Sequence, residues 1–161
     1  MRIPLLTSLG EDKDYLNNAV ILKSPRGLTK STFILDTGSP KTILNHFDAR
    51  RLQIPFNSGA KTEIIRLGGK TYQGYTFERI TFSFRSEDNQ LVREEFPVIV
   101  VRPTSPKEEE ELSNFPTIIG TDFLKKKRYI LFCDMEKGIA YLEKKEEQKD
   151  HQTTPNSTCK Y

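Results

Sequence analysis

The chain is poor in the residues that most directly mark catalytic and metal sites. Its 161 residues include two cysteines, two histidines and no tryptophan. Cys133 and Cys159 lie far apart, and His46 and His151 are separated by most of the chain. We therefore expect no disulfide framework, no metal site and no Ser-His-Asp triad.

Long hydrophobic runs are also lacking. Residues 1–7 are too short an apolar segment for a signal peptide or a membrane anchor, so we expect a cytoplasmic protein with no membrane partner. The net charge is only +3, and residues 125–128 are the only tight basic run. We interpret that run as a solvated helix end and expect no nucleic-acid partner.

Charged residues make up 29% of the chain and apolar residues 35%. The charges are concentrated in residues 107–111 and 143–150. Without these two stretches the composition is that of an ordinary domain with one core. We predict one domain over residues 1–142 and a polar, disordered tail over residues 143–161.

Short apolar or alternating segments occupy most of that domain. Residues 80–84 alternate strictly between apolar and polar, as a half-buried strand does. Strands are predicted at 19–22, 31–35, 42–44, 62–67, 71–84, 96–101, 117–120, 129–133 and 138–142. Residues 46–52 and 122–127 are predicted as short helices and 102–115 as a loop. The predicted fold class is all-β, with a closed or folded-over barrel and one or two short helices.

One acidic residue stands at a distinctive position. The apolar segment 33–35 runs directly into Asp36, Thr37, Gly38 and Ser39. A strand that ends in a carboxylate, a hydroxyl residue and a glycine places the acid at a tight turn beside the core, which makes it a functional candidate. Taken alone, the same residues would also suit an ordinary turn.

Further segments strengthen the case. Asp36, Thr37, Gly38 and Ser39 resemble the catalytic loop of the aspartic proteases. Ile118, Ile119 and Gly120, which lead into a predicted helix, resemble that family's second signature. The chain is therefore similar to the retropepsin-like aspartic proteases over residues 17–142.

A glycine pair between the two signatures lies where the family carries its flap. It suits a two-residue hairpin turn with positive φ angles. The predicted flap residues are Arg66, Leu67, Gly68, Gly69 and Lys70, with Tyr72 beside them. Viral members carry an arginine and an aspartate that form an ion pair, and this chain has Thr121 and Pro40 at those positions. The chain therefore resembles cellular or transposon-like members more closely.

The resemblance implies an aspartic endopeptidase. The sequence holds a single Asp-Thr-Gly, so a pair of catalytic carboxylates requires a homodimer with Asp36 from each chain. The substrate would be a peptide or protein, held in pockets lined by apolar residues such as Leu35 and Ile65. The mechanism needs no metal, cofactor or covalent intermediate. Thr37 is expected to reach the partner's loop, the Gly38 amide to point at the carboxylates, and Ser39 to hydrogen-bond the outer oxygen of Asp36.

Two other interpretations compete with this one, and the sequence disfavours the second. A protease-like dimeric module could bind peptides or assemble with little or no catalysis. A phosphoryl-transfer aspartate of the haloacid-dehalogenase type would need a second aspartate at position 38, where this chain has glycine. The strands that join the dimer are also open: residues 2–6 and residues 139–142 are the two candidates.

Overall fold

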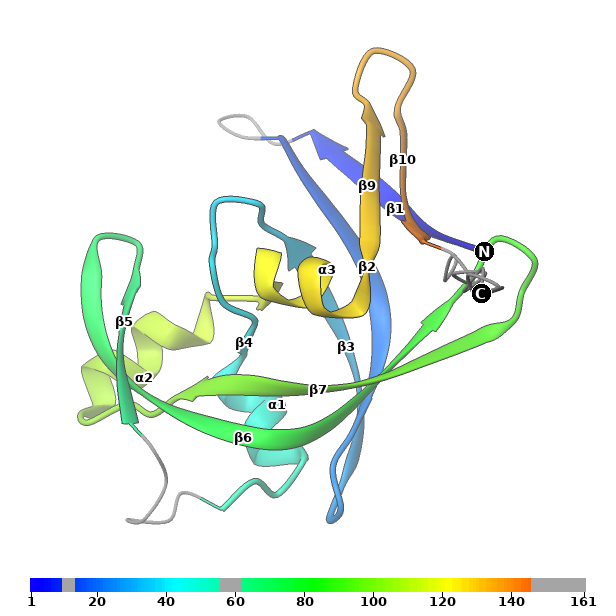
Figure 1. Ribbon diagram of the computed structural model, residues 1–161. Coiled ribbons are helices and arrows are strands. Elements are labelled where there is room, and N and C mark those ends of the chain that lie inside the picture. The colour runs from blue at the N-terminus through cyan, green and yellow to red at the C-terminus, as the bar shows by residue number, and fades with distance from the viewer. Residues whose placement is uncertain (10–13, 56–61, 146–161) are drawn as a thin grey trace, which may run out of the picture.

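The computed structural model describes residues 1–9, 14–55 and 62–145 (Figure 1). Its described part contains ten strands and three short helices. The strands are β1 Arg2–Leu9, β2 Asp14–Lys23, β3 Leu28–Leu35, β4 Ile43–Leu44, β5 Thr62–Leu67, β6 Lys70–Arg85, β7 Leu91–Val101, β8 Thr117–Ile119, β9 Tyr129–Asp134 and β10 Ile139–Lys144. The helices are α1 His46–Arg51, α2 Pro106–Ser113 and α3 Thr121–Lys127.

The prediction of a chain built mostly of strands, with few short helices, is confirmed. All strands belong to one sheet with the order β5-β6-β7-β4-β8-β3-β2-β1-β10-β9. β6 also pairs with β2. Following the strand pairs from β2 through β3, β8, β4, β7 and β6 therefore leads back to β2. The sheet therefore wraps around its own core, with β5 and β9 as its two outermost strands.

One prediction about local structure is wrong. Residues 102–115 are not a plain loop, because they contain α2, and this helix brings the number of helices to three. Ser105 caps α2 by accepting a hydrogen bond from the Glu108 amide at 3.2 Å, and Pro106 opens its first turn. The last strand, β10, runs to Lys144, two residues beyond the predicted end of the domain at residue 142. Residues 146–161 lie outside the described residues.

The main core contains a group of packed aromatic rings among its aliphatic side chains. Phe33, Phe82, Phe84 and Phe123 are all fully buried, and Phe33 meets Phe84 edge to face with 5.6 Å between ring centroids. Phe123 belongs to α3, so this helix is fixed to the inner surface of the sheet by its ring. Burying an aromatic side chain of this size contributes on the order of 2–3 kcal/mol. The core therefore sets the position of α3, which follows directly after β8.

A second apolar cluster lies between the β5–β6 hairpin and α2. It contains Ile43, Ile65, Leu67, Tyr72, Ile99, Val101, Leu112 and Ile118. Figure 1 shows this hairpin and α2 together at one end of the molecule, away from β9 and β10. Helix α2 thus covers a surface that a loop of the same length would leave open.

Candidate active site

Asp36 follows the last residue of β3. This strand pairs in parallel with β8, and Leu35 lies opposite Ile119. The Asp36 amide continues the ladder by donating to the Ile119 carbonyl oxygen at 3.1 Å. Ile118 and Ile119 are buried. The two sequence signatures, about eighty residues apart, are therefore adjacent in space, and the second supports the backbone of the first.

The loop after β3 holds the Asp36 carboxylate by one oxygen. The Gly38 amide donates to Asp36 Oδ1 at 2.8 Å, and the Ser39 amide donates to the Asp36 carbonyl oxygen at 3.1 Å. The amide of Gly38 therefore points at the carboxylate, as expected. Asp36, Thr37 and Gly38 are all exposed in the single chain. The other carboxylate oxygen thus remains accessible to a substrate or a second chain.

The expectation for Ser39 is wrong. Its hydroxyl donates to the Lys41 carbonyl oxygen at 2.8 Å, two residues along the same loop, rather than to the carboxylate of Asp36. A serine side chain readily bonds nearby backbone in this way. Ser39 therefore shapes the loop, and its hydroxyl does not contact the carboxylate of Asp36.

Gly120 allows the second signature to approach the loop closely. A Cβ atom at this position would lie 2.4 Å from the Lys41 carbonyl oxygen and 2.9 Å from that of Ser39. The following residue, Thr121, donates its amide to the Ser39 carbonyl oxygen at 2.9 Å. Only glycine fits this contact, so the loop that carries Asp36 rests directly on the start of α3.

A carboxylate that sequence reasoning missed secures the same contact. Asp122 accepts hydrogen bonds from the Thr42 hydroxyl at 2.7 Å and the Thr42 amide at 3.1 Å. The Thr42 hydroxyl in turn accepts from the Gly120 amide at 3.1 Å. The available signal was an acidic residue in the first turn of a helix beside the second signature.

An open groove lies beside Asp36. It has a volume of about 750 Å³ and is lined largely by apolar side chains. Asp36 and Thr37 form its polar part, and the remaining lining residues are Tyr15, Leu16, Ile34, Leu35, Leu131, Cys133 and Met135. The predicted pocket residue Leu35 belongs to this groove. Ile65, the other pocket residue expected from the sequence, is buried under the β5–β6 hairpin instead.

The predicted flap residues form the tip of the β5–β6 hairpin. Gly68 and Gly69 make its two-residue turn with φ angles of 55° and 79°, which is the backbone that glycine adopts readily. Arg66 and Lys70 are exposed, whereas Leu67 is buried in the second cluster. The tip is therefore only partly exposed, because one of its residues packs inward with Tyr72.

An ion pair connects this tip to α2. Lys70 Nζ lies 2.5 Å from Glu111 Oε1, and the Tyr72 hydroxyl donates to Glu111 Oε2 at 3.3 Å. The hydrogen bond from Lys70 lowers the pKa of the Glu111 carboxyl. A Cβ at Gly68 would also lie 3.0 Å from the Phe115 ring. In the single chain the hairpin thus rests on α2.

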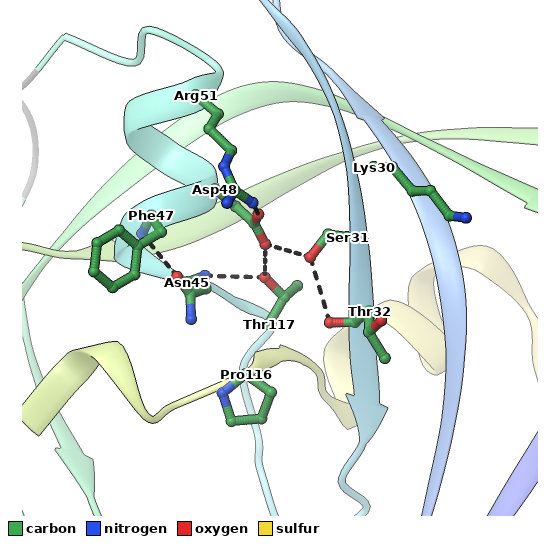
Figure 2. Close-up of a pocket in the computed structure, with 9 residues that line it drawn as sticks. All are labelled: Lys30, Ser31, Thr32, Asn45, Phe47, Asp48, Arg51, Pro116 and Thr117. Carbon is green, nitrogen blue, oxygen red and sulfur yellow. Dashed lines mark hydrogen bonds and ion pairs between the residues drawn. The ribbon is translucent and has the colours of Figure 1, made fainter.

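A second, more polar pocket of about 460 Å³ surrounds a buried carboxylate (Figure 2). Asp48 accepts hydrogen bonds from the hydroxyls of Ser31 and Thr117, the latter at 2.8 Å. Arg51 lies 3.6 Å from its other oxygen. Both Asp48 oxygens are therefore engaged within the chain, which is the pattern of a structural carboxylate.

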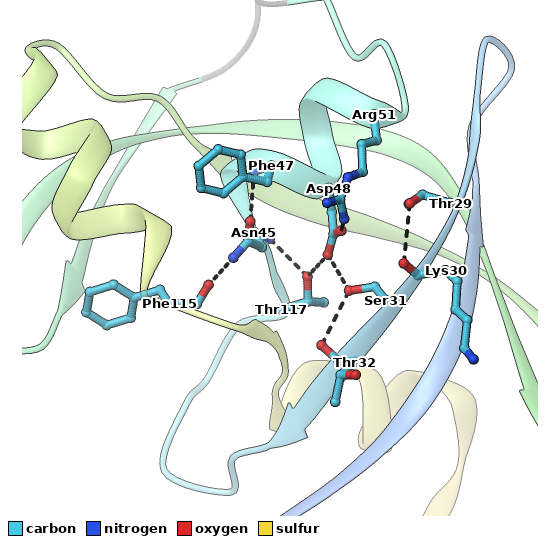
Figure 3. A network of polar contacts seen from close by, with 10 residues as sticks. All are labelled: Thr29, Lys30, Ser31, Thr32, Asn45, Phe47, Asp48, Arg51, Phe115 and Thr117. Carbon is cyan, nitrogen blue, oxygen red and sulfur yellow. Dashed lines mark hydrogen bonds and ion pairs between the residues drawn. The ribbon is translucent and has the colours of Figure 1, made fainter.

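Figure 3 shows how far this network extends. The backbone amide of Asn45 donates to Thr117 Oγ1 at 3.0 Å, and the side-chain amide of Asn45 donates to the Phe115 carbonyl oxygen. The network thus joins the start of α1 to β3 and to the start of β8. It fixes the same pair of strands that carries Asp36, but from another part of their length.

Within the described ranges, no group of three His, Cys, Asp or Glu residues could hold a metal ion. A search of the same ranges found no helix with the length and apolar character needed to span a membrane.

Comparison with known proteins gives a structural likeness without a sequence relative. No family model matches the chain, and no curated protein matches it. Among solved structures, a retropepsin-like aspartic protease from Rickettsia conorii superimposes with a TM-score of 0.55 at 14% identity. The match covers 89% of this chain and 91% of that one. At this identity the likeness concerns the fold alone: the chain has a retropepsin-like fold.

Proposed function

We infer that the protein is an aspartic endopeptidase, active as a homodimer, with Asp36 as the catalytic carboxylate of each chain. One observation carries this inference. Within a retropepsin-like fold, Asp36 is an exposed carboxylate at the end of a core strand, held by the Gly38 amide on a loop that the second signature supports. A carboxylate with an accessible oxygen on a fixed loop is suited to acid–base chemistry.

The dimer follows from the number of motifs. The sequence contains one Asp-Thr-Gly, and Asp122, the acidic residue nearest the second signature, bonds Thr42 instead of facing the groove. A second carboxylate must therefore come from a second chain. In a twofold dimer the two Asp36 loops would meet at the symmetry axis, and Thr37 would face its own counterpart.

The proposed chemistry uses the two carboxylates unequally. Two carboxylates a few ångströms apart cannot both ionise easily, so they share one proton. The ionised carboxylate acts as a general base on a water molecule, which attacks the peptide carbonyl carbon. The protonated carboxyl polarises the carbonyl oxygen and then supplies a proton to the leaving nitrogen.

The groove and the hairpin fit a peptide substrate. Apolar side chains such as Leu35 and Leu131 line the groove beside Asp36, so apolar substrate side chains are expected there. The β5–β6 hairpin would act as the flap that covers the substrate and excludes water. To reach over Asp36, its tip would have to exchange the Lys70–Glu111 contact for contacts with the substrate.

Within the family, we favour a cellular or transposon-like member over a viral one. Pro40 and Thr121 cannot form the ion pair that viral members place there. In this chain the Thr42–Asp122 hydrogen bonds join the same two segments.

Proteolysis of a peptide library at mildly acidic pH tests the proposal. The wild-type chain should cleave, a statine-type inhibitor should block cleavage, and Asp36→Asn should abolish it. Specific activity should rise with protein concentration, since the site needs two chains. Cleavage that survives Asp36→Asn would overturn the proposal. Binding of peptides without cleavage by the wild-type chain would instead support the non-catalytic peptide-binding module.

A further inference from the structure

One edge of the sheet lacks a partner strand among the described residues. β9 pairs with β10 on one side, and no described strand lies on its other side. The other end of the sheet, β5, carries Glu63 and Arg66, and charges of this kind discourage edge-to-edge pairing. By contrast, residues 129–133 of β9 have no charged side chain. An uncharged edge of this length is suited to pairing with another strand.

The two segments expected to join the dimer are already occupied within the chain. Residues 2–5 pair with β10, and residues 6–9 pair with β2. β10 lies between β1 and β9. Interleaving the N-terminal strand with a second chain would require these internal ladders to open. The free edge of β9 requires no such rearrangement.

β9 also borders the candidate active site. Leu131 and Cys133 line the same groove as Asp36 and Thr37. Figure 1 shows β9 beside α3, the helix on whose start the Asp36 loop rests. A second chain bound along β9 would therefore lie next to Asp36.

Two backbone hydrogen bonds show which groups of β9 point outward. The Lys145 amide donates to the Arg128 carbonyl oxygen, and the Lys144 amide donates away from β9, to the Met1 carbonyl oxygen. In an antiparallel ladder this alternation directs the polar groups of residues 130, 132 and 134 toward β10. The amides and carbonyls of Tyr129, Leu131 and Cys133 therefore face the free edge.

We propose that two copies of the chain join by antiparallel pairing of β9 with β9 about a twofold axis at Leu131, continuing the sheet from one copy into the other. This inference rests on the proposed function and specifies how its dimer forms. Leu131 pairs with its own counterpart, and Tyr129 lies opposite the partner's Cys133. All outward backbone groups are then used, whereas a shift of the axis to residue 130 or 132 leaves those of Cys133 or Tyr129 without partners.

Side chains support the same register. Ile130 and Phe132 are 46% and 45% exposed. In this register each Ile130 would lie opposite a Phe132 of the other copy, and the contact removes apolar surface from water. At the ends of the strand, the exposed Arg128 would lie opposite the partner's Asp134, so opposite charges meet twice across the axis. One register thus satisfies the backbone, the apolar side chains and the charges.

Disulfide cross-linking reads this register directly. Cys133→Ser, Cys159→Ser and Asp36→Asn together give a cysteine-free background without autolysis, into which Ile130→Cys, Leu131→Cys and Phe132→Cys are introduced one at a time. Directly opposed residues have Cα atoms about 5.5 Å apart, within disulfide range, whereas diagonal neighbours lie about 7–8 Å apart. Mild oxidation should link most of the Leu131→Cys protein into dimers and little of the other two.

A mixture provides the matched control. Ile130→Cys combined with Phe132→Cys should form the mixed disulfide that neither variant forms with itself. Circular dichroism confirms that each variant is folded. Dominant cross-linking of Ile130→Cys or Phe132→Cys alone, equal linking of all three, or no linking at Leu131 by folded protein would overturn the proposed interface.

The outcome separates the interface from the activity, because cross-linking needs no catalysis. Cross-linking at Leu131 together with a wild-type chain that never cleaves would leave the interface standing and overturn the protease. Cleavage that depends on Asp36, without cross-linking at Leu131, would do the reverse.

Discussion

Two aspartates in contact with the β3–β8 region illustrate opposite uses of a carboxylate. Asp48 is buried, and it accepts hydrogen bonds from the hydroxyls of Ser31 and Thr117 while Arg51 lies close to its other oxygen. Asp36 is exposed and accepts one side-chain hydrogen bond, from the Gly38 amide. The carboxylate with all its partners inside the chain holds the fold, and the one with an open oxygen is available for chemistry.

The difference also explains why a hollow that contains a carboxylate does not identify the site by itself. The pocket around Asp48 is polar, yet both oxygens of its carboxylate are engaged by side chains of the same chain. The groove at Asp36 is mostly apolar and holds the less satisfied carboxylate. Removing Asp36 should therefore reduce activity much more than stability. Removing Asp48 should reduce stability much more than activity.

Asp36→Asn should give the largest effect, and on activity alone. Loss of the general base should reduce kcat/KM by at least about a thousandfold, equivalent to roughly 4 kcal/mol. The free energy of unfolding should change by less than about 0.5 kcal/mol, since the side chain is exposed. Peptide-cleavage kinetics and thermal unfolding measure the two quantities. A large fall in stability would mean that Asp36 is structural, as Asp48 is.

Asp48→Ala should show the reverse pattern. It leaves the hydroxyls of Ser31 and Thr117 without their buried acceptor, which should cost about 3 kcal/mol of unfolding free energy. For a chain of this size that corresponds to a fall in Tm of about 6–12 °C. Denaturant unfolding checks the value, and kcat of the protein that remains folded should stay within a few-fold of wild type.

Glu94→Gln extends the comparison to a third carboxylate, one held by cations. Burial raises the pKa of Glu94, but hydrogen bonds from Lys144 and Tyr129 outweigh it, so the pKa is lowered. A lowered pKa stabilises the fold above the unfolded value, about 4.3, and this stabilisation is lost as the pH falls through the folded value. The variant should be about 2 kcal/mol less stable at pH 7.

Unfolding measured across pH tests the sign of this effect. The difference between wild type and Glu94→Gln should narrow as the pH falls below about 4, because wild-type Glu94 then becomes protonated. A difference that stays constant down to pH 3 would contradict the role of the charge and leave only a packing effect.

Thr42→Val should give a small loss of stability while also affecting activity. The substitution removes the hydroxyl that joins Asp122 to the Gly120 amide and should cost about 1 kcal/mol. Because this hydroxyl braces the loop that carries Asp36, kcat should fall while KM changes little. Thr32→Val, at an exposed position of β3, is the matched control and should alter neither quantity.

Sequence reasoning succeeded where the signal was local. The glycine pair at 68 and 69 predicted a two-residue turn, and alternation in residues 80–84 predicted a strand; both are present. It failed at α2, although Ser105 and Pro106 carry a readable helix start, because the acidic composition favoured a solvated loop.

Long-range contacts account for the other failures. The Thr42–Asp122 bonds join residues eighty positions apart, and no sequence periodicity links them. The partner of Ser39 depended on the exact path of its loop, which places the Lys41 carbonyl within reach. The apolar residues of β9 were recognised as a strand, but their position at the edge of the sheet emerges only from the full topology.

The parallel pairing of β3 with β8 has a consequence for how the protein is made. Leu35 and Ile119 can meet only after most of the domain has been synthesised, and folding dominated by such distant contacts takes milliseconds to seconds. A ribosome-bound fragment that ends before β8 therefore lacks the support beneath Asp36. The order of synthesis therefore delays assembly of the loop, because the nascent chain contains Asp36 long before β8 is available to support it.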